Sequence, residues 1–234
     1  MRMNLSRRAM ALLTVGLSTG AVTACTARTA PGPGGAARAA ATRTDLPPPV
    51  LSGGVSLEQA LARRRSVRSF DPEPLTLQQL GQLMWAAQGV TSGLGYRTAP
   101  SGGALYPLEL YAATRDATLH YLPAGHRVER WEPVLGWADL VDATPSTEPV
   151  TQAPAVFVIG GVVRRTAIKY GGRSREYVDL EAGHCAQNLL LQAVSLGLGA
   201  VPIGAYNAGR VARYLALPTG ESVLYLIPVG HPRS

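Results

Sequence analysis

The stretch KYGGRSREYVDLEAGHCAQNLLLQAVSLGLGAVPIGAY, residues 169–206, joins a long apolar helix to a glycine-rich turn. Between about residues 178 and 198, leucines, alanines and valines cover more than one helical face, as in a helix enclosed on several sides. Gly197 and Gly199 follow, and glycine readily adopts the left-handed backbone that ends a helix. The chain then becomes extended, and Gly204 allows another group to approach the backbone closely. The pattern indicates the spine of a ligand site.

Length and composition predict one globular domain with appendages. The chain has 234 residues, 46% hydrophobic and 16% charged, which allows a buried core and argues against disorder. The net charge is +7, but Arg2, Arg7 and Arg8 lie before residue 25 and the other arginines are largely scattered. Aromatic residues make up 6% and do not alternate with basic ones, so no nucleic-acid partner is expected. Cys25 and Cys185 lack metal-ligand spacing, so no metal site is expected.

Residues 1–24 have the organisation of an export signal. A basic start precedes an apolar run of roughly 14 residues, shorter than the ~18–20 that a membrane-spanning helix needs. Arg7 and Arg8 resemble a twin-arginine signal, and Val-Thr-Ala-Cys, ending at Cys25, resembles a lipobox whose cysteine becomes lipidated. A plain secretory signal is the alternative.

The sequence after Cys25 predicts a tether and then a folded domain. Residues 25–53 are rich in Ala, Pro and Gly, and such a composition is typical of a flexible linker. The folded domain is expected over residues 54–234. If the signal functions as described, the protein is exported by the twin-arginine route. It then lies as a lipoprotein on the outer face of the bacterial cytoplasmic membrane.

The remaining pattern predicts an α+β fold. Capping boxes at Ser56 and Thr76 each open an expected helix. A hairpin and two buried strands are also expected, over residues 108–113, 119–122, 155–160 and 223–229. Because these strands are interleaved with helices, we assign the domain to the α+β class.

Two groups of residues are candidates for chemistry. Arg64 and Arg68 place two guanidinium groups around Ser66, which suits a phosphate but also fits a solvated helix end. Lys169, the single lysine of the chain, and Tyr170 are candidates for proton transfer. A lysine with its ordinary pKa of ~10.4 is a poor base until it is desolvated or placed near another cation. A single lysine can also reflect the arginine-rich composition.

The apolar helix carries polar residues that need an explanation. His184 lies one turn after Glu181, and on an apolar helix it is expected to be a hydrogen-bonded core histidine rather than a ligand. Gln187 and Asn188 need hydrogen-bond partners. A cofactor, a subunit interface or neighbouring backbone could supply them.

Together these segments resemble the FMN-dependent nitroreductase superfamily, and within it the SagB/ThcOx-type azoline dehydrogenases. The resemblance spans about residues 56–233 and depends on the order of five motifs. They are RRSVRSF (64–70), APSGGALYPLELY (99–111), the KY pair (169–170), EAGHCAQNLLLQAVSLGLGAVPIGAY (181–206) and PVGHPR (228–233).

The resemblance implies a mixed, mainly antiparallel sheet wrapped by helices, in a homodimer that binds FMN at the subunit interface. It also implies roles for individual residues. Lys169 and Tyr170 would assist dehydrogenation, and Ser101 would contact FMN from the partner subunit. The residues implied to contact FMN within one chain are Arg64, Arg65, Ser66 and Arg68 at the phosphate and ribityl side, Pro202, Ile203, Gly204 and Ala205 along the isoalloxazine, and Arg233 at the phosphate.

The family resemblance predicts an FMN-dependent oxidoreductase that transfers a hydride between a small-molecule or peptide-derived substrate and flavin N5. Ala104 and Gly204 stand where many nitroreductases have Asn and Glu, which disfavours an ordinary nitroreductase more than the dehydrogenase branch. The chain also ends just after Arg233, which weakens the expected phosphate contact there. An NAD(P)H-dependent nitroreductase or quinone reductase is the first alternative, and a non-catalytic flavin-binding protein is the second.

Overall fold

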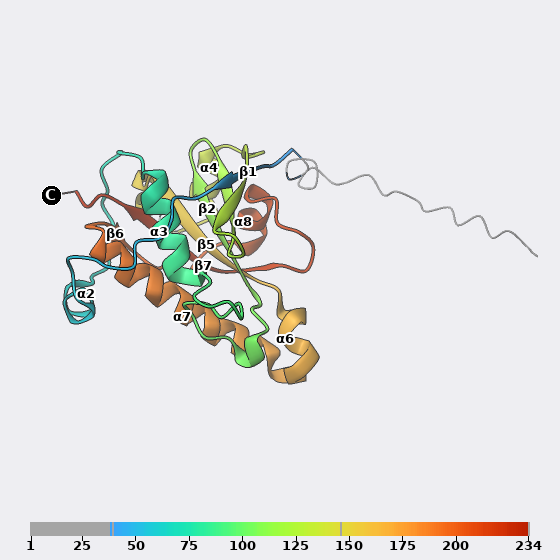
Figure 1. Cartoon of the computed structure of the whole chain (residues 1–234). Helices are drawn as coiled ribbons and strands as arrows, with labels where there is room; N and C mark the ends of the chain where they lie inside the picture. The colour runs from blue at the N-terminus through green and yellow to red at the C-terminus, as the bar shows by residue number, and fades with distance from the viewer. Residues whose placement is uncertain (1–37, 39, 146, 234) are drawn as a thin grey trace, which may run out of the picture. The chain divides into compact units, whose positions relative to one another are not determined.

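The fold is an antiparallel sheet packed between helices, seen here in a computed structural model that describes residues 38, 40–145 and 147–233 (Figure 1). The sheet has seven strands in the order β1-β4-β3-β2-β5-β7-β6, and every named pair is antiparallel. The strands are β1 (Thr42–Asp45), β2 (Leu108–Thr114), β3 (Thr118–Leu122), β4 (Arg127–Trp131), β5 (Ala155–Gly161), β6 (Gly199–Ala200) and β7 (Ser222–Gly230). The predicted α+β class and mainly antiparallel sheet are confirmed.

The helices surround this sheet. They are α2 (Leu57–Arg63), α3 (Leu77–Gln88), α4 (Trp137–Val141), α5 (Thr147–Gln152), α6 (Val163–Tyr170), α7 (Ser174–Ser195) and α8 (Ala208–Tyr214), with short 3₁₀ turns at η1 (Gly102–Ala104) and η2 (Gly171–Arg173). Both predicted capping boxes are present. Ser56 and Thr76 accept the backbone N–H of Gln59 and Gln79, whose side chains return to the cap backbone. These bonds satisfy N–H groups that helix starts otherwise leave unpaired.

Two apolar cores hold the layers together. On one face, α3 and α7 cover alternate residues of the central strands, including Leu110, Phe157 and Ile227. On the other face, α4, α5 and α8 cover the intervening residues, such as Tyr111 and Val158. Strand β5 is buried along its whole length, because a central strand with helices on both faces has no side exposed to water.

Helix α7 is the long helix expected from the sequence, although it starts and ends earlier than predicted. It ends at Ser195, and Gly197 adopts the left-handed φ of +71° that was expected there. Gly199 lies in strand β6 instead of ending the helix. Burial is also less complete than expected, because the side chain of Leu180 is 61% exposed. His184 is exposed, so its assignment to the core was wrong.

The expected tether contains folded residues at its end. Strand β1 pairs with β4, and the side chain of Leu46 is buried in the core. The backbone of Val50 exchanges two hydrogen bonds with the Gln82 side chain, at 2.7 and 3.0 Å. The domain boundary at residue 54 was therefore too late, because these polar and proline-rich residues are held by strand pairing, by hydrogen bonds to Gln82 and by burial of the single side chain of Leu46. Residues 1–37, with the predicted signal and Cys25, lie outside the described residues.

Candidate functional site

The residues expected to bind a phosphate follow helix α2 and run beside strand β6. Ser66 forms a parallel bridge with Ala200, and the N–H of Val67 donates to the Ala200 carbonyl at 3.0 Å. Gly199 makes this approach possible, since an added Cβ would lie 2.6 Å from Cγ1 of Val67. Two predicted segments that are distant in sequence, 64–68 and 202–205, are thus held side by side.

A cavity of about 440 Å³ opens where these segments meet. Arg68 lines it together with Pro202, Ile203, Gly204 and Ala205. The backbone there is fixed, because Ile203 exchanges two hydrogen bonds with Leu226, at 2.7 and 3.2 Å. Gly204 has room, since an added Cβ would meet nothing within 4 Å. The structure therefore brings these five predicted cofactor residues to one cavity.

The cations at this edge have few partners within the chain. Among the described residues, the one hydrogen-bond acceptor of the Arg68 guanidinium is the Ser66 carbonyl, at 3.5 Å, and Arg65 donates to the carbonyls of Ala62 and Arg64. In the described part of the chain, none of Arg64, Arg65 and Arg68 forms a salt bridge. Guanidinium groups without carboxylate partners favour an anionic group, and a phosphate can accept their forked N–H donors.

One acidic residue, Glu148, also lines the cavity, and it has a neutral partner. Its carboxylate accepts a hydrogen bond from the Gln152 side chain at 3.1 Å. Arg64 and Arg65 line an adjacent hollow of about 230 Å³ instead of the cavity that holds Arg68. The predicted arginine group is therefore divided between two neighbouring depressions.

Arg233 lies on the same side of the fold and already has a partner. The C-terminal segment runs beside residues 69–71, where the N–H of Arg233 donates to the Ser69 carbonyl at 3.1 Å. The guanidinium of Arg233 pairs with Asp71, with 3.5 Å between Nε and Oδ1. Both side chains are about half exposed, so this pair is weak and leaves further donors on Arg233 free to bind an anion.

The predicted catalytic pair lies against a second element, the glycine loop, defined here as residues 101–104. Gly103 adopts a left-handed φ of +63°, and an added Cβ would lie 3.1 Å from Nζ of Lys169 and 3.3 Å from the Tyr170 hydroxyl. Lys169 and Tyr170 are the last residues of α6. The Tyr170 ring packs against that of Tyr177 of α7, tilted by 32°, with 4.4 Å between ring centroids. The sequence did not predict α6, so the contact between this pair and the loop was not expected.

Glu181 of α7 holds the glycine loop in place through a hydrogen bond. This role was not predicted from the sequence. Its Oε1 accepts the Gly102 N–H at 2.9 Å, although the residue is only 5% exposed. Burial raises the pKa of the Glu181 carboxyl, and the hydrogen bonds from Gly102 and Ser101 oppose that effect. The available signal was an acidic residue within an apolar helix, because a buried carboxylate needs a partner.

Arg165 connects α6 to the sheet and was also missed. Its guanidinium donates to the carbonyl of Tyr106 at 3.1 Å and pairs with Glu109 of β2. Arg165 lies one helical turn before Lys169. The residue that anchors α6 and the proposed catalytic residue are therefore on the same short helix.

Within one chain, the glycine loop and the cavity at Arg68 remain separate. Among the described residues, no hydrogen bond, ion pair or ring contact joins Ser101, Lys169 or Tyr170 to the residues that line the cavity. Ser101 uses its hydroxyl to accept the Tyr106 N–H at 2.9 Å. The side-chain amide of Asn188 donates to the Thr98 carbonyl at 3.2 Å. Of the three partners considered from the sequence, neighbouring backbone therefore supplies this hydrogen bond.

The described residues contain no candidate metal centre and no candidate membrane span. No grouping of three or more His, Cys, Asp and Glu side chains is arranged to hold a metal ion in residues 38, 40–145 and 147–233. Over the same residues, no helix combines the length and apolarity needed to cross a membrane.

Comparison with known proteins identifies the family. The Nitroreductase family model matches residues 61–231. A Methanocaldococcus jannaschii protein, MJ1384, whose name assigns it to the nitroreductases, is 39% identical over 182 residues, covering 75% of this chain and 91% of its own. A crystal structure from Ralstonia eutropha JMP134, also described as a nitroreductase, is 30% identical with a TM-score of 0.72, over 82% of this chain and 90% of that one.

Two more distant structures share the fold. A Desulfovibrio desulfuricans structure described as a nitroreductase in complex with FMN is 24% identical with a TM-score of 0.57, over 76% of this chain and 87% of that one. A chain of the Escherichia coli microcin synthetase McbBCD complex with truncated pro-MccB17 bound is 22% identical with a TM-score of 0.63, over 82% of this chain and 79% of that one. The family model covers more than half of the sequence, so this chain belongs to the nitroreductase family, a family of oxidoreductases.

Proposed function

We propose that this protein is an FMN-dependent dehydrogenase of the SagB/ThcOx type that acts on a small-molecule or peptide-derived substrate. Membership of the nitroreductase family gives the reaction class, which is oxidation and reduction. The observation that carries the finer assignment is the contact of Lys169 and Tyr170 with the glycine loop. This places a cation and a phenol beside a loop that the resemblance assigns to the flavin site.

FMN is the cofactor, and the residues present fit it. The cavity at Arg68 offers a backbone wall at residues 202–205 and a guanidinium without a carboxylate partner. Arg64 and Arg65 add positive charge in the adjacent hollow, which suits the phosphate of FMN. When bound, FMN supplies the hydride acceptor or donor, while the protein provides orientation and electrostatics.

Lys169 and Tyr170 are assigned to proton transfer. Both side chains reach the backbone of Gly103, with Nζ and the hydroxyl within 3.3 Å of the position of an added Cβ. As a hydride leaves one substrate carbon, a proton leaves the adjacent position, and either group could accept that proton. Lys169 is exposed in a single chain, and a lysine becomes an effective base only when it is desolvated or lies close to another cation.

The active protein is proposed to be a homodimer. Ser101, Lys169 and Tyr170 do not line the cavity at Arg68 of their own chain, so in the proposed dimer a partner subunit brings them to it. Large apolar side chains remain exposed on the helices and on the loop after α3, which favours a subunit interface. These side chains include Leu57 at 61%, Leu94 at 80% and Ile168 at 86% exposure.

We also propose export by the twin-arginine route and lipid attachment at Cys25. The support is the pair Arg7 and Arg8 before an apolar run and the small residues ahead of Cys25. The membrane surface is then a partner through the lipid, and the folded domain needs no span of its own. Labelling with an acyl-chain precursor in a bacterial host tests this, and a Cys25→Ala variant that still carries label contradicts it.

The absorption spectrum of the purified protein tests the cofactor. Flavin absorption bands near ~370 and ~450 nm are expected, either in the protein as purified or after FMN is added to it. The residue assignment is tested with Lys169→Ala, which is expected to lower turnover of an azoline-containing peptide by about 10²- to 10⁴-fold at unchanged flavin content. Arg164→Ala is the matched control, because Arg164 is an exposed cation on the same helix. Equal activity in Lys169→Ala and wild type would remove the assigned base.

The names of MJ1384 and of the Ralstonia eutropha structure favour a second function, an NAD(P)H-dependent nitroreductase or quinone reductase. Anaerobic mixing with NADH or NADPH separates the two functions. Rapid bleaching of the flavin followed by turnover of a nitroarene or quinone selects the reductase, whereas bleaching only by the azoline substrate selects the dehydrogenase. A flavin that responds to neither donor indicates the third possibility, a flavin-binding protein without turnover.

A further inference from the structure

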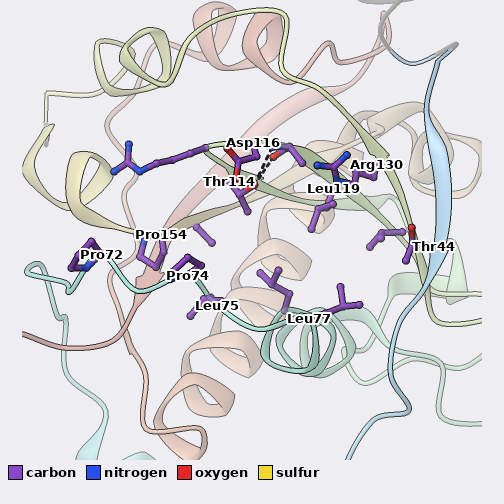
Figure 2. A pocket seen from close by; sticks show the side chains of 15 residues that line it. Thr44, Pro72, Pro74, Leu75, Leu77, Thr114, Asp116, Leu119, Arg130 and Pro154 are labelled. Carbon is purple, nitrogen blue, oxygen red and sulfur yellow. Dashed lines mark hydrogen bonds between the residues drawn. The ribbon is translucent and has the colours of Figure 1, made fainter.

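A cavity separate from the proposed flavin site lies between the start of α3 and the turn that joins β2 to β3. Its volume is about 350 Å³ (Figure 2). In Figure 2, Pro74, Leu75 and Leu77 form one wall, and Leu119 extends toward them from the opposite side. None of its lining residues also lines the cavity at Arg68.

The floor of this cavity is part of the hydrophobic core. Leu75, Leu80, Leu119 and Val128 line it and belong to the core between α3 and the sheet. These four floor residues are at most 9% exposed, and the more accessible apolar lining is that of Leu77, 41% exposed, and of the exposed Pro72 and Pro74. A cavity of this size with an apolar floor and apolar walls favours an apolar ligand, because burial releases water from both surfaces.

The charged groups at the opening define the rest of the ligand. Arg130 of β4 lines the cavity, and in the described residues its guanidinium forms no hydrogen bond or salt bridge. Its neighbours on the edge of the sheet differ, because Arg43 pairs with Glu129 and Arg127 pairs with Asp45. Arg130 is thus the cation on this strand that is available to an external anion.

The other two charged lining residues do not reverse this preference. Arg115 already has partners, because its guanidinium donates to the Thr151 carbonyl at 2.7 Å and lies 5.0 Å from the Trp137 ring. Asp116 is exposed at the turn. Two cations against one carboxylate leave a positive balance at the opening, so an anionic head group is favoured over a cationic one.

We propose that this cavity binds an amphipathic organic anion. Its carboxylate or equivalent head pairs with Arg130, and its apolar body lies on the floor formed by Leu75, Leu80, Leu119 and Val128. The size suits a body of roughly ten heavy atoms, near the lower limit of small-molecule sites. The proposal stands without the assignment of the flavin reaction, because the two cavities share no residue.

Calorimetric titration of the full chain with octanoate and with 1-octanol tests the head and the body separately. Octanoate is expected to bind at one site per chain, about five- to tenfold more tightly than 1-octanol, as one charge-assisted pair contributes. Arg130→Gln is expected to remove this preference and leave 1-octanol binding unchanged. Arg164→Gln, which removes an exposed cation from helix α6, is expected to change neither affinity.

A second variant tests the location. Leu77→Trp places a larger side chain at the opening without removing core atoms, and it is expected to weaken both ligands at least about fivefold. Circular dichroism and a thermal scan confirm that each variant is folded. The proposal is overturned if wild type shows no saturable octanoate binding, if Arg130→Gln keeps the preference for octanoate, or if Leu77→Trp leaves both affinities unchanged.

Discussion

The Glu181 carboxylate accepts the backbone N–H of Gly102 at 2.9 Å, which joins helix α7 to the glycine loop. Because burial raises the pKa of Glu181 above its ordinary value of 4.5, the native state holds this proton to higher pH than the unfolded chain does. The contribution of Glu181 to stability is therefore greatest at low pH and falls as pH rises from about 4.5 through the native pKa.

Glu181→Gln is expected to remove this pH dependence and keep an acceptor for Gly102. At neutral pH the variant should be as stable as wild type or more stable, and wild type should gain relative to it as pH falls toward about 4. Urea unfolding across this range measures the difference. Glu132→Gln, which changes an exposed carboxylate that has no hydrogen bond or salt bridge within the described residues, is the control. A difference between Glu181→Gln and wild type that does not vary with pH would contradict the prediction.

Gly103→Ala tests the contact with Lys169. An added Cβ would lie 3.0 Å from Cδ of Lys169, so the lysine must move. If the proposed function is correct, turnover should fall by up to ~100-fold, since misplacing a catalytic group by about 1 Å can have this effect. Gly171→Ala is a matched control, because Gly171 also has a left-handed φ, of +52°, but an added Cβ meets nothing within 4 Å.

Gly103→Ala is expected to lose about 1–2 kcal/mol of unfolding free energy from its left-handed backbone. Gly171→Ala should lose at least as much, because φ +52° with ψ −126° is a region that glycine adopts far more readily than alanine. Only Gly103→Ala should also lose activity per bound flavin. Equal activity in the two variants would show that the position of Lys169 at the loop does not matter for turnover.

Glu109 is predicted to stabilise the fold above acidic pH. Burial opposes its ionisation, but the hydrogen bond and charge of His120, together with Arg165, outweigh that effect and lower the pKa of Glu109 below 4.5. A carboxyl whose native pKa is lowered contributes stability above its unfolded pKa and loses it as pH falls through the native value. Glu109→Gln should therefore cost about 1–3 kcal/mol at neutral pH.

The cost of Glu109→Gln should shrink when unfolding is repeated below pH ~4. Glu132→Gln, an exposed carboxylate with no hydrogen bond or salt bridge within the described residues, provides the comparison. Its effect should be close to zero at every pH. A Glu109→Gln penalty that stays constant into acid would show that the ion pair is not its cause.

The thiol of Cys185 is expected to be inert in the native protein. It is fully buried, and this burial raises its pKa to about 12. In a Cys25→Ser variant, which leaves Cys185 as the single thiol, a disulfide reagent near pH ~8 should react only after unfolding in concentrated urea. Rapid reaction of the folded variant would indicate that α7 opens locally.

Local signals in the sequence predicted much of the fold. The capping boxes at Ser56 and Thr76 and the apolar strand predicted over 155–160 depend on neighbouring residues, so they could be recognised. Strand β1, Thr-Arg-Thr-Asp, could not, because it is exposed along its length and is held by its pairing with β4. Helix α6 was missed because a single residue of it, Thr166, is buried.

The candidate site was predictable in its residues more than in its geometry. Family resemblance identified Arg68, the 202–205 segment and Lys169, and the structure brings the first two to one cavity. The contacts that hold these segments in place could be identified only from the fold. Ser66 meets Ala200 across a bridge, and Glu181 meets Gly102 between elements that no sequence spacing connects.

Pairing of β1 with β4 has a practical consequence for producing the protein. A recombinant version that starts at residue 54, where composition alone would cut it, would lack β1 and make β4 the outermost strand. The bare amides of Arg127–Trp131 could then pair with other molecules, a common route to aggregation. Truncation to remove the export signal should therefore stop before Arg38, whose guanidinium lies 5.0 Å from the Trp131 ring.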